Sequence, residues 1–269
     1  MKHEQADAKT AENVLTHADT FFPFSRALRP DATRGKIEIF IAPSEESFQK
    51  LTGGMIPHWG TACAFPTRGL IVLKSPRLVN VWKEPLEIIL RHELVHIYLH
   101  RISPRGLPRW FDEGAATYLS GEWGLRDNLD LAIAVLTGNL IPLADMNTEY
   151  PSAESRVNLF YIQSYSTVAF LASHLRTDHF MSFFHRMLTS SSFESALYQQ
   201  TGLTLQAFEK KWEGWLKRNY HPLYLLGRSE FLFIFLLLML FVAYIAKRRR
   251  LKKTIAAMDD EFDNNEWME

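Results

Sequence analysis

The chain has 269 residues, 47% of them hydrophobic, so it can bury a sizeable core in one or two domains and is not expected to be disordered. Lys and Arg together number 30, as do Asp and Glu, and the resulting net charge of zero argues against nucleic acid as a partner. Cys63 is the only cysteine, which excludes an intramolecular disulfide.

The N-terminal third has the pattern of a small sheet. Residues 36–42 (KIEIFIA) alternate charged and apolar side chains with a period of two, which is typical of a strand. The other elements predicted here are a helix over 11–28, a short helix that opens at Pro43-Ser44 and runs to about Leu51, and two strands over 61–65 and 69–74.

Helical spacing begins at Glu84. Pro85 suits the first turn of a helix that extends to about His100, and a second helix should run from Arg109 to Leu119, ended by Gly121. Further helices are predicted over 127–136, 154–176, 178–200 and 204–219. Strands followed by helices predict an α+β fold with a small N-terminal sheet and a helical C-terminal part.

The first of these helices carries the sequence HELVH at residues 92–96. Side chains at positions i and i+4 lie on one face of a helix, so His92 and His96 can both reach a single Zn²⁺. Glu93 is then placed next to the metal, where it can act as a general base. The motif alone leaves open the alternative of two histidines on a helix surface.

A third protein ligand is needed to complete such a zinc site. The metzincin pattern fails, because Leu99 and Ile102 stand where it requires Gly and His. Glu113 fits better, because the turn over 103–108, rich in Pro and Gly, returns the chain and brings the next helix against the first. We therefore predict one Zn²⁺ per chain, bound by His92, His96 and Glu113.

The sequence resembles the gluzincins, and in particular the peptidase MA-like group. The resemblance rests on HELVH together with LPRWFDEGAATYLSG at residues 107–121, which is similar to a Trp-x-x-Glu-Gly-x-Ala-x-Tyr pattern whose Glu is the third zinc ligand. That Glu is Glu113 here. Asp112 replaces the Asn found in aminopeptidase relatives, and it could orient a ligand or be solvated. The resemblance implies a zincin-like fold and a zinc-dependent peptidase.

The segment YIQSYSTVAFL resembles the helix that carries a transition-state tyrosine in aminopeptidase relatives. Tyr161 takes the place of that tyrosine, while Gln163 and Ser164 replace the Lys and Gly of its Tyr-x-Lys-Gly pattern. The resemblance therefore implies that Tyr161 is catalytic. Tyr165, one turn later on the same face, is the alternative.

Aminopeptidases of this kind hold the substrate amino group with an acidic residue, but the corresponding loop here, GGMIP at residues 53–57, has none. An endopeptidase-like activity on peptides or proteins is therefore favoured, with Glu84 or Glu87 left as alternative acids. The competing hypothesis is a catalytically silent, membrane-tethered binding module that keeps the zinc fold. A purely structural zinc site fits less well, because three ligands leave the metal open.

The sequence also predicts contact with a lipid bilayer. Residues 231–246 are apolar and are followed by KRRRLKK, so a single-pass span is expected, with the basic tail in the cytoplasm and the zinc domain outside. No signal peptide is visible, and a tail-anchored cytoplasmic domain is the alternative. The predicted domains are an N-terminal segment (1–30), a zincin-like metallopeptidase domain (31–220), a transmembrane helix with its basic flank (223–250) and an acidic tail (251–269).

Overall fold

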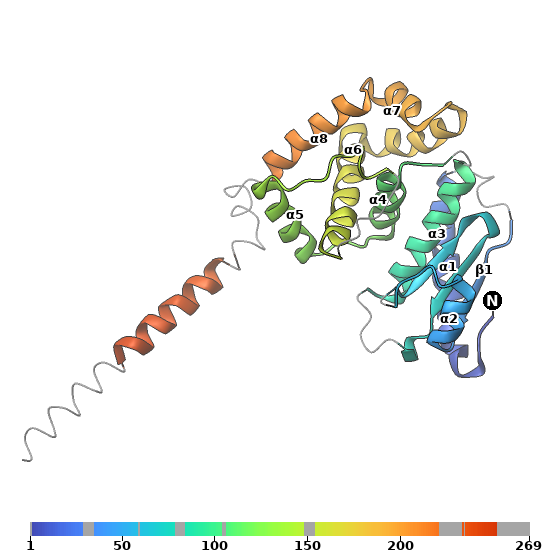
Figure 1. Ribbon diagram of the computed structural model, residues 1–269, viewed down its shortest axis with the longest axis horizontal. Coiled ribbons are helices and arrows are strands. Elements are labelled where there is room, and N and C mark those ends of the chain that lie inside the picture. Colours follow the sequence, from blue (N-terminus) through green and yellow to red (C-terminus); the bar gives the residue numbers. More distant parts are fainter. Residues whose placement is uncertain are drawn as a thin grey trace, which may run out of the picture. The chain divides into compact units, whose positions relative to one another are not determined.

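The computed structural model describes residues 2–28, 35–58, 60–78, 84–103, 106–147, 154–220, 233 and 235–251. The chain divides into two compact units, Met1–Trp215 and Leu216–Glu269. The first unit combines one small sheet with most of the helices (Figure 1). Its strands are β1 (Glu38–Ala42), β2 (Ala62–Phe65) and β3 (Leu70–Lys74). The helices of eight or more residues are α1 (Ala8–Leu28), α2 (Glu45–Thr52), α3 (Leu86–Ile102), α4 (Arg109–Ser120), α5 (Leu125–Thr137), α6 (Glu154–Thr189), α7 (Phe193–Thr201) and α8 (Leu205–Asn219), the last of which crosses into the second unit.

The sheet has the strand order β1-β3-β2, with β3 parallel to β1 and antiparallel to β2. On one face, Phe48 of α2 packs against Ala42 and Val72. Ile71 and Leu73 alternate with Val72 and are also fully buried, so both faces of β3 are covered. An apolar run such as LIVL is typical of a strand buried on both faces.

The N-terminal residues contact the outer edge of the sheet and the segment that follows it. Lys2 pairs with the outer edge of β1, where its N–H donates to the Ile39 carbonyl and its carbonyl accepts from the Ile41 N–H, both at 3.0 Å. Buried Asp7 follows in the 3₁₀ helix η1 (Gln5–Asp7) and binds the Arg77 guanidinium through both carboxylate oxygens, at 3.1 and 2.8 Å. This ion pair fastens the start of the chain to the segment that follows β3.

The helical part is built around α4, which packs against α3 and α6. Gly114 makes the approach to α6 possible, because a Cβ there would lie 2.2 Å from the Ser164 carbonyl oxygen. Two fully buried aromatic side chains, Trp110 and Phe111, fill the space beside it and both contact Phe193 of α7. The Gly that follows Glu113 in the sequence is thus required by helix packing.

The largest differences from the predicted helix bounds are in α6 and α7. The sequence predicts two helices over 154–176 and 178–200, whereas α6 continues to Thr189 and α7 starts at Phe193. Residues 154–189 contain neither Gly nor Pro, so nothing stops the helix at the predicted break. The turn comes at Ser192, whose side chain caps α7 by accepting from the Ser195 N–H at 3.1 Å.

The predicted fold class, an α+β domain followed by a transmembrane helix, was wrong. The described residues are mostly helical, because the strands have only five, four and five residues while α6 alone has 36. Among these residues, no helix has both the length and the apolarity needed to cross a membrane.

The predicted span at 231–246 falls on a helical run over 235–251, in which the apolar residues soon give way to Lys247–Arg250. With Lys247–Arg250 included, the described run does not combine the length and the apolarity of a spanning helix. The finding contradicts the predicted single-pass placement, with its extracytoplasmic zinc domain and cytoplasmic tail, and gives no support for bilayer contact. Residues 231, 232, 234 and 252–269 lie outside the described part of the chain.

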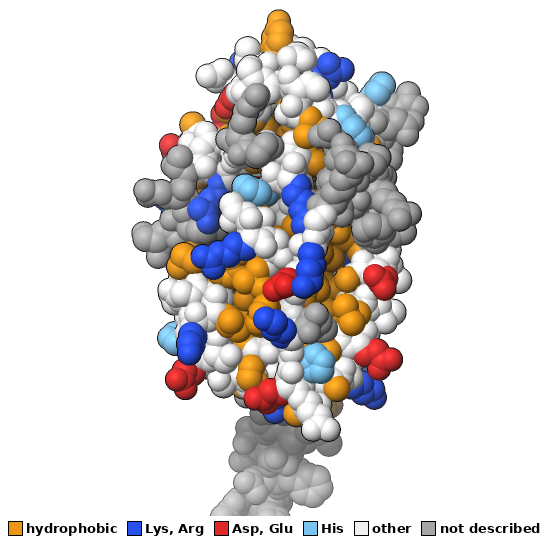
Figure 2. Space-filling view, turned by 90° about the vertical axis from the view of Figure 1, so that its right-hand side faces the viewer, with side chains coloured by type: hydrophobic (Ala, Val, Ile, Leu, Met, Phe, Trp, Pro, Cys, Tyr) orange, Lys and Arg blue, Asp and Glu red, His pale blue; other side chains and the backbone are white. Residues whose placement is uncertain are grey.

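The face that carries the sheet and its flanking helices has a mixed surface. Figure 2 shows Lys and Arg side chains interspersed with Asp, Glu and His around a central group of hydrophobic side chains. This mixture agrees with the net charge of zero, because neither sign of charge dominates the face.

Candidate metal centre and surrounding cavity

Helix α3 carries three of the predicted site residues on its inner side. His92, Glu93 and His96 lie in the middle of a helix that starts after Pro85, so the helical i, i+4 spacing is fully formed there. The two imidazole rings have centroids 4.9 Å apart and an interplanar angle of 69°. Both rings therefore face the same region from successive turns.

Helix α4 supplies Glu113 from its second turn. Its carboxylate oxygen Oε2 lies 3.6 Å from Nε2 of His92 and 3.6 Å from Nε2 of His96. One ligand atom from each of the three residues lies within 4.8 Å of the others, and this group could hold a metal ion. Two imidazole nitrogens and one carboxylate oxygen are the donor set of catalytic zinc sites, which keep an open position for water. The residues therefore fit the metal that the sequence predicts.

A carboxylate also contacts the other nitrogen of each imidazole. Nδ1 of His96 lies 3.2 Å from Asp112, and Nδ1 of His92 lies 2.9 Å from Glu122. The structure thus gives Asp112 the orienting contact that the sequence left open. Glu122 was missed, and the only signal for it is its position next to Gly121, the residue that ends α4.

Neighbouring carboxylates raise the pKa of both imidazoles of the site. Burial would lower the pKa of His92, but the Glu113 and Glu122 carboxylates outweigh it and raise this pKa well above the usual value. Burial acts in the same direction on His96, yet Asp112 and Glu113 raise its pKa to about 9. A metal ion that binds these imidazoles must therefore displace protons, so its affinity falls as the pH falls.

Glu93 is 9% exposed and lies against strand β2. Burial raises the pKa of its carboxyl group. The charges of His92 and His96, and to a smaller extent a hydrogen bond from the Ala64 N–H, partly offset this increase. A carboxylate whose pKa is raised toward neutrality is suited to take up and return a proton.

The strand predicted over 69–74 corresponds to β3, which lies in the centre of the sheet between β1 and β2 and therefore presents no free edge to the site. The strand next to the site is β2. Directly before it, the Thr61 carbonyl accepts a hydrogen bond from the Lys74 N–H of β3. The Ala64 N–H points away from β3 to Glu93, and by alternation the main-chain groups of Ala62 point the same way. An extended peptide can pair with main-chain groups presented in this manner.

A cavity of about 370 Å³ adjoins these residues. His92, Glu93 and Ala62 line it, together with Glu122 and Tyr161. The cavity therefore brings the proposed base, one imidazole and the outer side of β2 to the same space.

The structure distinguishes the two candidate tyrosines and the two candidate acids. Tyr161 lines the cavity, whereas Tyr165 stacks on Trp123 with ring centroids 3.8 Å apart and an angle of 10° between the rings. Glu84 also lines the cavity, whereas Glu87 lies 3.2 Å from Nε2 of His17. Of each pair, Tyr161 and Glu84 are placed where a substrate in the cavity could meet them.

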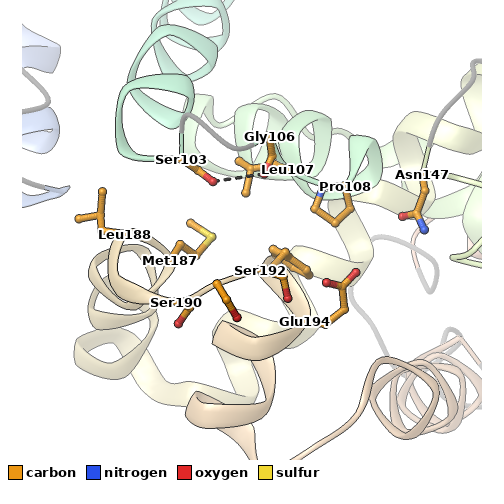
Figure 3. Close-up of a pocket in the computed structure, with 12 residues that line it drawn as sticks. Ser103, Gly106, Leu107, Pro108, Asn147, Met187, Leu188, Ser190, Ser192 and Glu194 are labelled. Atoms are coloured by element: carbon orange, nitrogen blue, oxygen red, sulfur yellow. Dashed lines mark hydrogen bonds between the residues drawn. The ribbon is translucent and has the colours of Figure 1, made fainter.

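A second cavity, of about 470 Å³, lies elsewhere in the first unit, between the α3–α4 connection and the α6–α7 turn (Figure 3). Its wall includes Ser103, Asn147 and Glu194, and the Ser103 hydroxyl donates to the Gly106 carbonyl at 3.3 Å. The predicted catalytic and metal-binding residues do not line this cavity.

Comparison with known proteins agrees with this geometry. A sequence model described as the peptidase MA superfamily matches residues 31–218, which include both histidines and all the carboxylates of the site. No curated protein matches the chain.

Proposed function

Because the chain belongs to the peptidase MA superfamily, we propose that it is a zinc-dependent hydrolase of peptide bonds, with His92, His96 and Glu113 as the metal ligands. Membership of a peptidase superfamily implies peptides or proteins as substrates. The observation that carries the proposal is the convergence of the three ligand atoms within 4.8 Å beside a cavity that Glu93 also lines. We assign the activity to the domain predicted over 31–220.

A zinc ion held by these three residues would supply Lewis acidity, which lowers the pKa of water so that a hydroxide nucleophile is available near neutral pH. Glu93 takes a proton from the attacking water and returns it to the leaving amine. Its raised pKa supports the first step, because a carboxylate with a higher pKa is a stronger base.

Tyr161 is proposed to donate a hydrogen bond to the carbonyl oxygen as negative charge develops there. Its place in the cavity wall supports this role, while the stacking of Tyr165 on Trp123 supports a structural role for Tyr165. Tyr161→Phe should lower kcat by about 100-fold, and Tyr165→Phe should change it far less. Equal activities of the two variants would remove Tyr161 from the mechanism.

We favour cleavage within a chain over removal of N-terminal residues. Glu84 remains the acid that could hold a substrate amino group, since it lines the cavity. The positions of the cuts distinguish the two activities: internal cuts are expected, and stepwise loss of N-terminal residues would contradict the endopeptidase assignment and point to Glu84.

The test of the function uses the full chain loaded with zinc, a mixture of unstructured peptides as substrate and mass spectrometry as the readout. Glu93→Gln should retain zinc and lose about 10²- to 10⁴-fold in rate. Glu87→Gln is the matched control, because it makes the same change on the same helix at a residue that pairs with His17. No cleavage by the zinc-loaded wild type would favour a catalytically silent binding module, and undiminished cleavage by Glu93→Gln would assign the base elsewhere.

A further inference from the structure

Glu122 is held in place by the end of helix α4. Gly121 ends the helix with a φ of 84°, in the left-handed region that favours glycine. The Glu122 N–H then donates to the Thr117 carbonyl at 3.1 Å. The termination of the helix therefore fixes the backbone from which the Glu122 side chain reaches α3.

The next residue anchors the same segment from the other side. Trp123 stacks on Tyr165 of α6, and its N–H donates to the Gly121 carbonyl at 3.1 Å. Glu122 thus lies between a capped helix end and a stacked aromatic pair, and its side chain is only 30% exposed. A carboxylate restrained in this way gives His92 a partner at a fixed position.

We propose that Glu122 is a positioning residue for the metal ligand His92, an inference that rests on the proposed zinc site. A neutral imidazole carries one proton, and the negative charge of the Glu122 carboxylate, 2.9 Å from Nδ1, favours that proton on Nδ1 over Nε2. The lone pair then resides on Nε2, which is the nitrogen that faces Glu113. Glu122 therefore orients the ring and makes Nε2 a better donor to the metal.

Residues near the start of α4 and just beyond its end therefore both contact His92. Glu113 near its start faces Nε2, while Glu122 just beyond its C-terminus faces Nδ1. Asp112 provides the equivalent contact for His96, but from the residue directly before the ligand Glu113. The position of Asp112 beside His96 therefore follows from the motif around Glu113. The position of Glu122 beside His92 depends instead on where α4 ends.

The test measures the zinc affinity of the full chain by competition with a chromogenic chelator. Glu122→Ala should weaken zinc binding by about 10- to 100-fold. Glu122→Gln should recover part of this loss, because its amide oxygen still accepts the Nδ1–H. Thermal denaturation of both variants in excess chelator measures their effect on folding, which separates it from their effect on metal binding.

Glu87→Ala is the matched control, since it also removes a Glu that contacts a histidine, namely His17, and it should bind zinc as the wild type does. Unchanged zinc affinity in Glu122→Ala would overturn the positioning role while leaving the proposed function intact. An equal loss in Glu122→Ala and Glu122→Gln would also overturn it, because an oxygen acceptor beside Nδ1 would then not be the cause. A wild-type chain that binds no zinc would overturn the proposed function itself.

Discussion

Buried charges at the sheet and at the α3–α4 site have different surroundings. At the sheet, buried Asp7 binds the Arg77 guanidinium, and buried Lys74 lies 2.7 Å from the Glu45 carboxylate and donates to the His58 carbonyl at 2.7 Å. Each of these buried groups is thus neutralised by a side chain of opposite permanent charge.

At the site, the buried side chains Glu93 and Glu113 lie among imidazoles that carry a positive charge only when protonated. Asp112 and Glu122 add two further carboxylates next to these histidines. Each buried charge at the sheet therefore has a counter-charge within the protein. At the site, four carboxylates outnumber two imidazoles, so an added cation would be favourable. This difference separates charges that stabilise the fold from charges that serve a function.

The largest effect on stability is expected at the sheet. Arg77→Ala leaves the Asp7 carboxylate buried without its cation and should lower the free energy of unfolding by about 2 kcal/mol. Lys36→Ala is the control, because the Lys36–Glu38 pair is exposed and should contribute little. Urea denaturation checks both variants, and an equal effect of the two would show that burial does not distinguish these pairs.

A smaller effect of the opposite sign is expected at the site. Because burial raises the pKa of Glu93, the folded chain holds this proton more tightly than the unfolded chain, and stability is lost as the pH rises above 4.5. Glu93→Gln cannot ionise and should stabilise the chain in excess chelator at neutral pH by about 1 kcal/mol.

The matched control for Glu93→Gln is Asp7→Asn. Arg77 is the main cause of the lowered pKa of Asp7, so loss of the Asp7 charge should destabilise the fold. Thermal denaturation compares the two variants. Melting temperatures that shift in the same direction in both variants would contradict the proposed difference between the sheet and the site.

The smallest effect concerns the acid stability of the sheet. Lys74 is the main cause that lowers the pKa of Glu45 to about 2, so the contribution of Glu45 is complete above pH 4.5 and is lost as the pH falls toward 2. Since the Glu45 side chain is 42% exposed, solvent screening limits this contribution to about 1 kcal/mol or less. Glu45→Gln should flatten the stability profile in this pH range, and Glu46→Gln should not; parallel profiles would contradict the assignment.

The parts of the site that follow local rules could be predicted from the sequence. Helical periodicity alone places His92, Glu93 and His96 on one helix, and the turn over 103–108 returns the chain so that α4 brings Glu113 to them. The apolar run over 70–74 was also identified as a strand, but its central position was not. Strand order depends on pairing between distant segments, which a local pattern does not encode.

Glu122 shows the same limit within the site. Its contact with His92 depends on where α4 ends and on how Trp123 stacks against α6. Nothing in the spacing between Glu113 and Glu122 indicates that both reach the same imidazole. Apolarity likewise suggested a membrane span over 231–246, but among the described residues no helix is both long and apolar enough to cross a membrane.

The central claim is that His92, His96 and Glu113 together bind one zinc ion, and the zinc content of the purified full chain tests it most directly. Elemental analysis should find one zinc per chain in the wild type and in Glu93→Gln, and loss of bound zinc in His92→Ala, His96→Ala and Glu113→Ala. Full zinc occupancy in all three alanine variants would contradict the assignment.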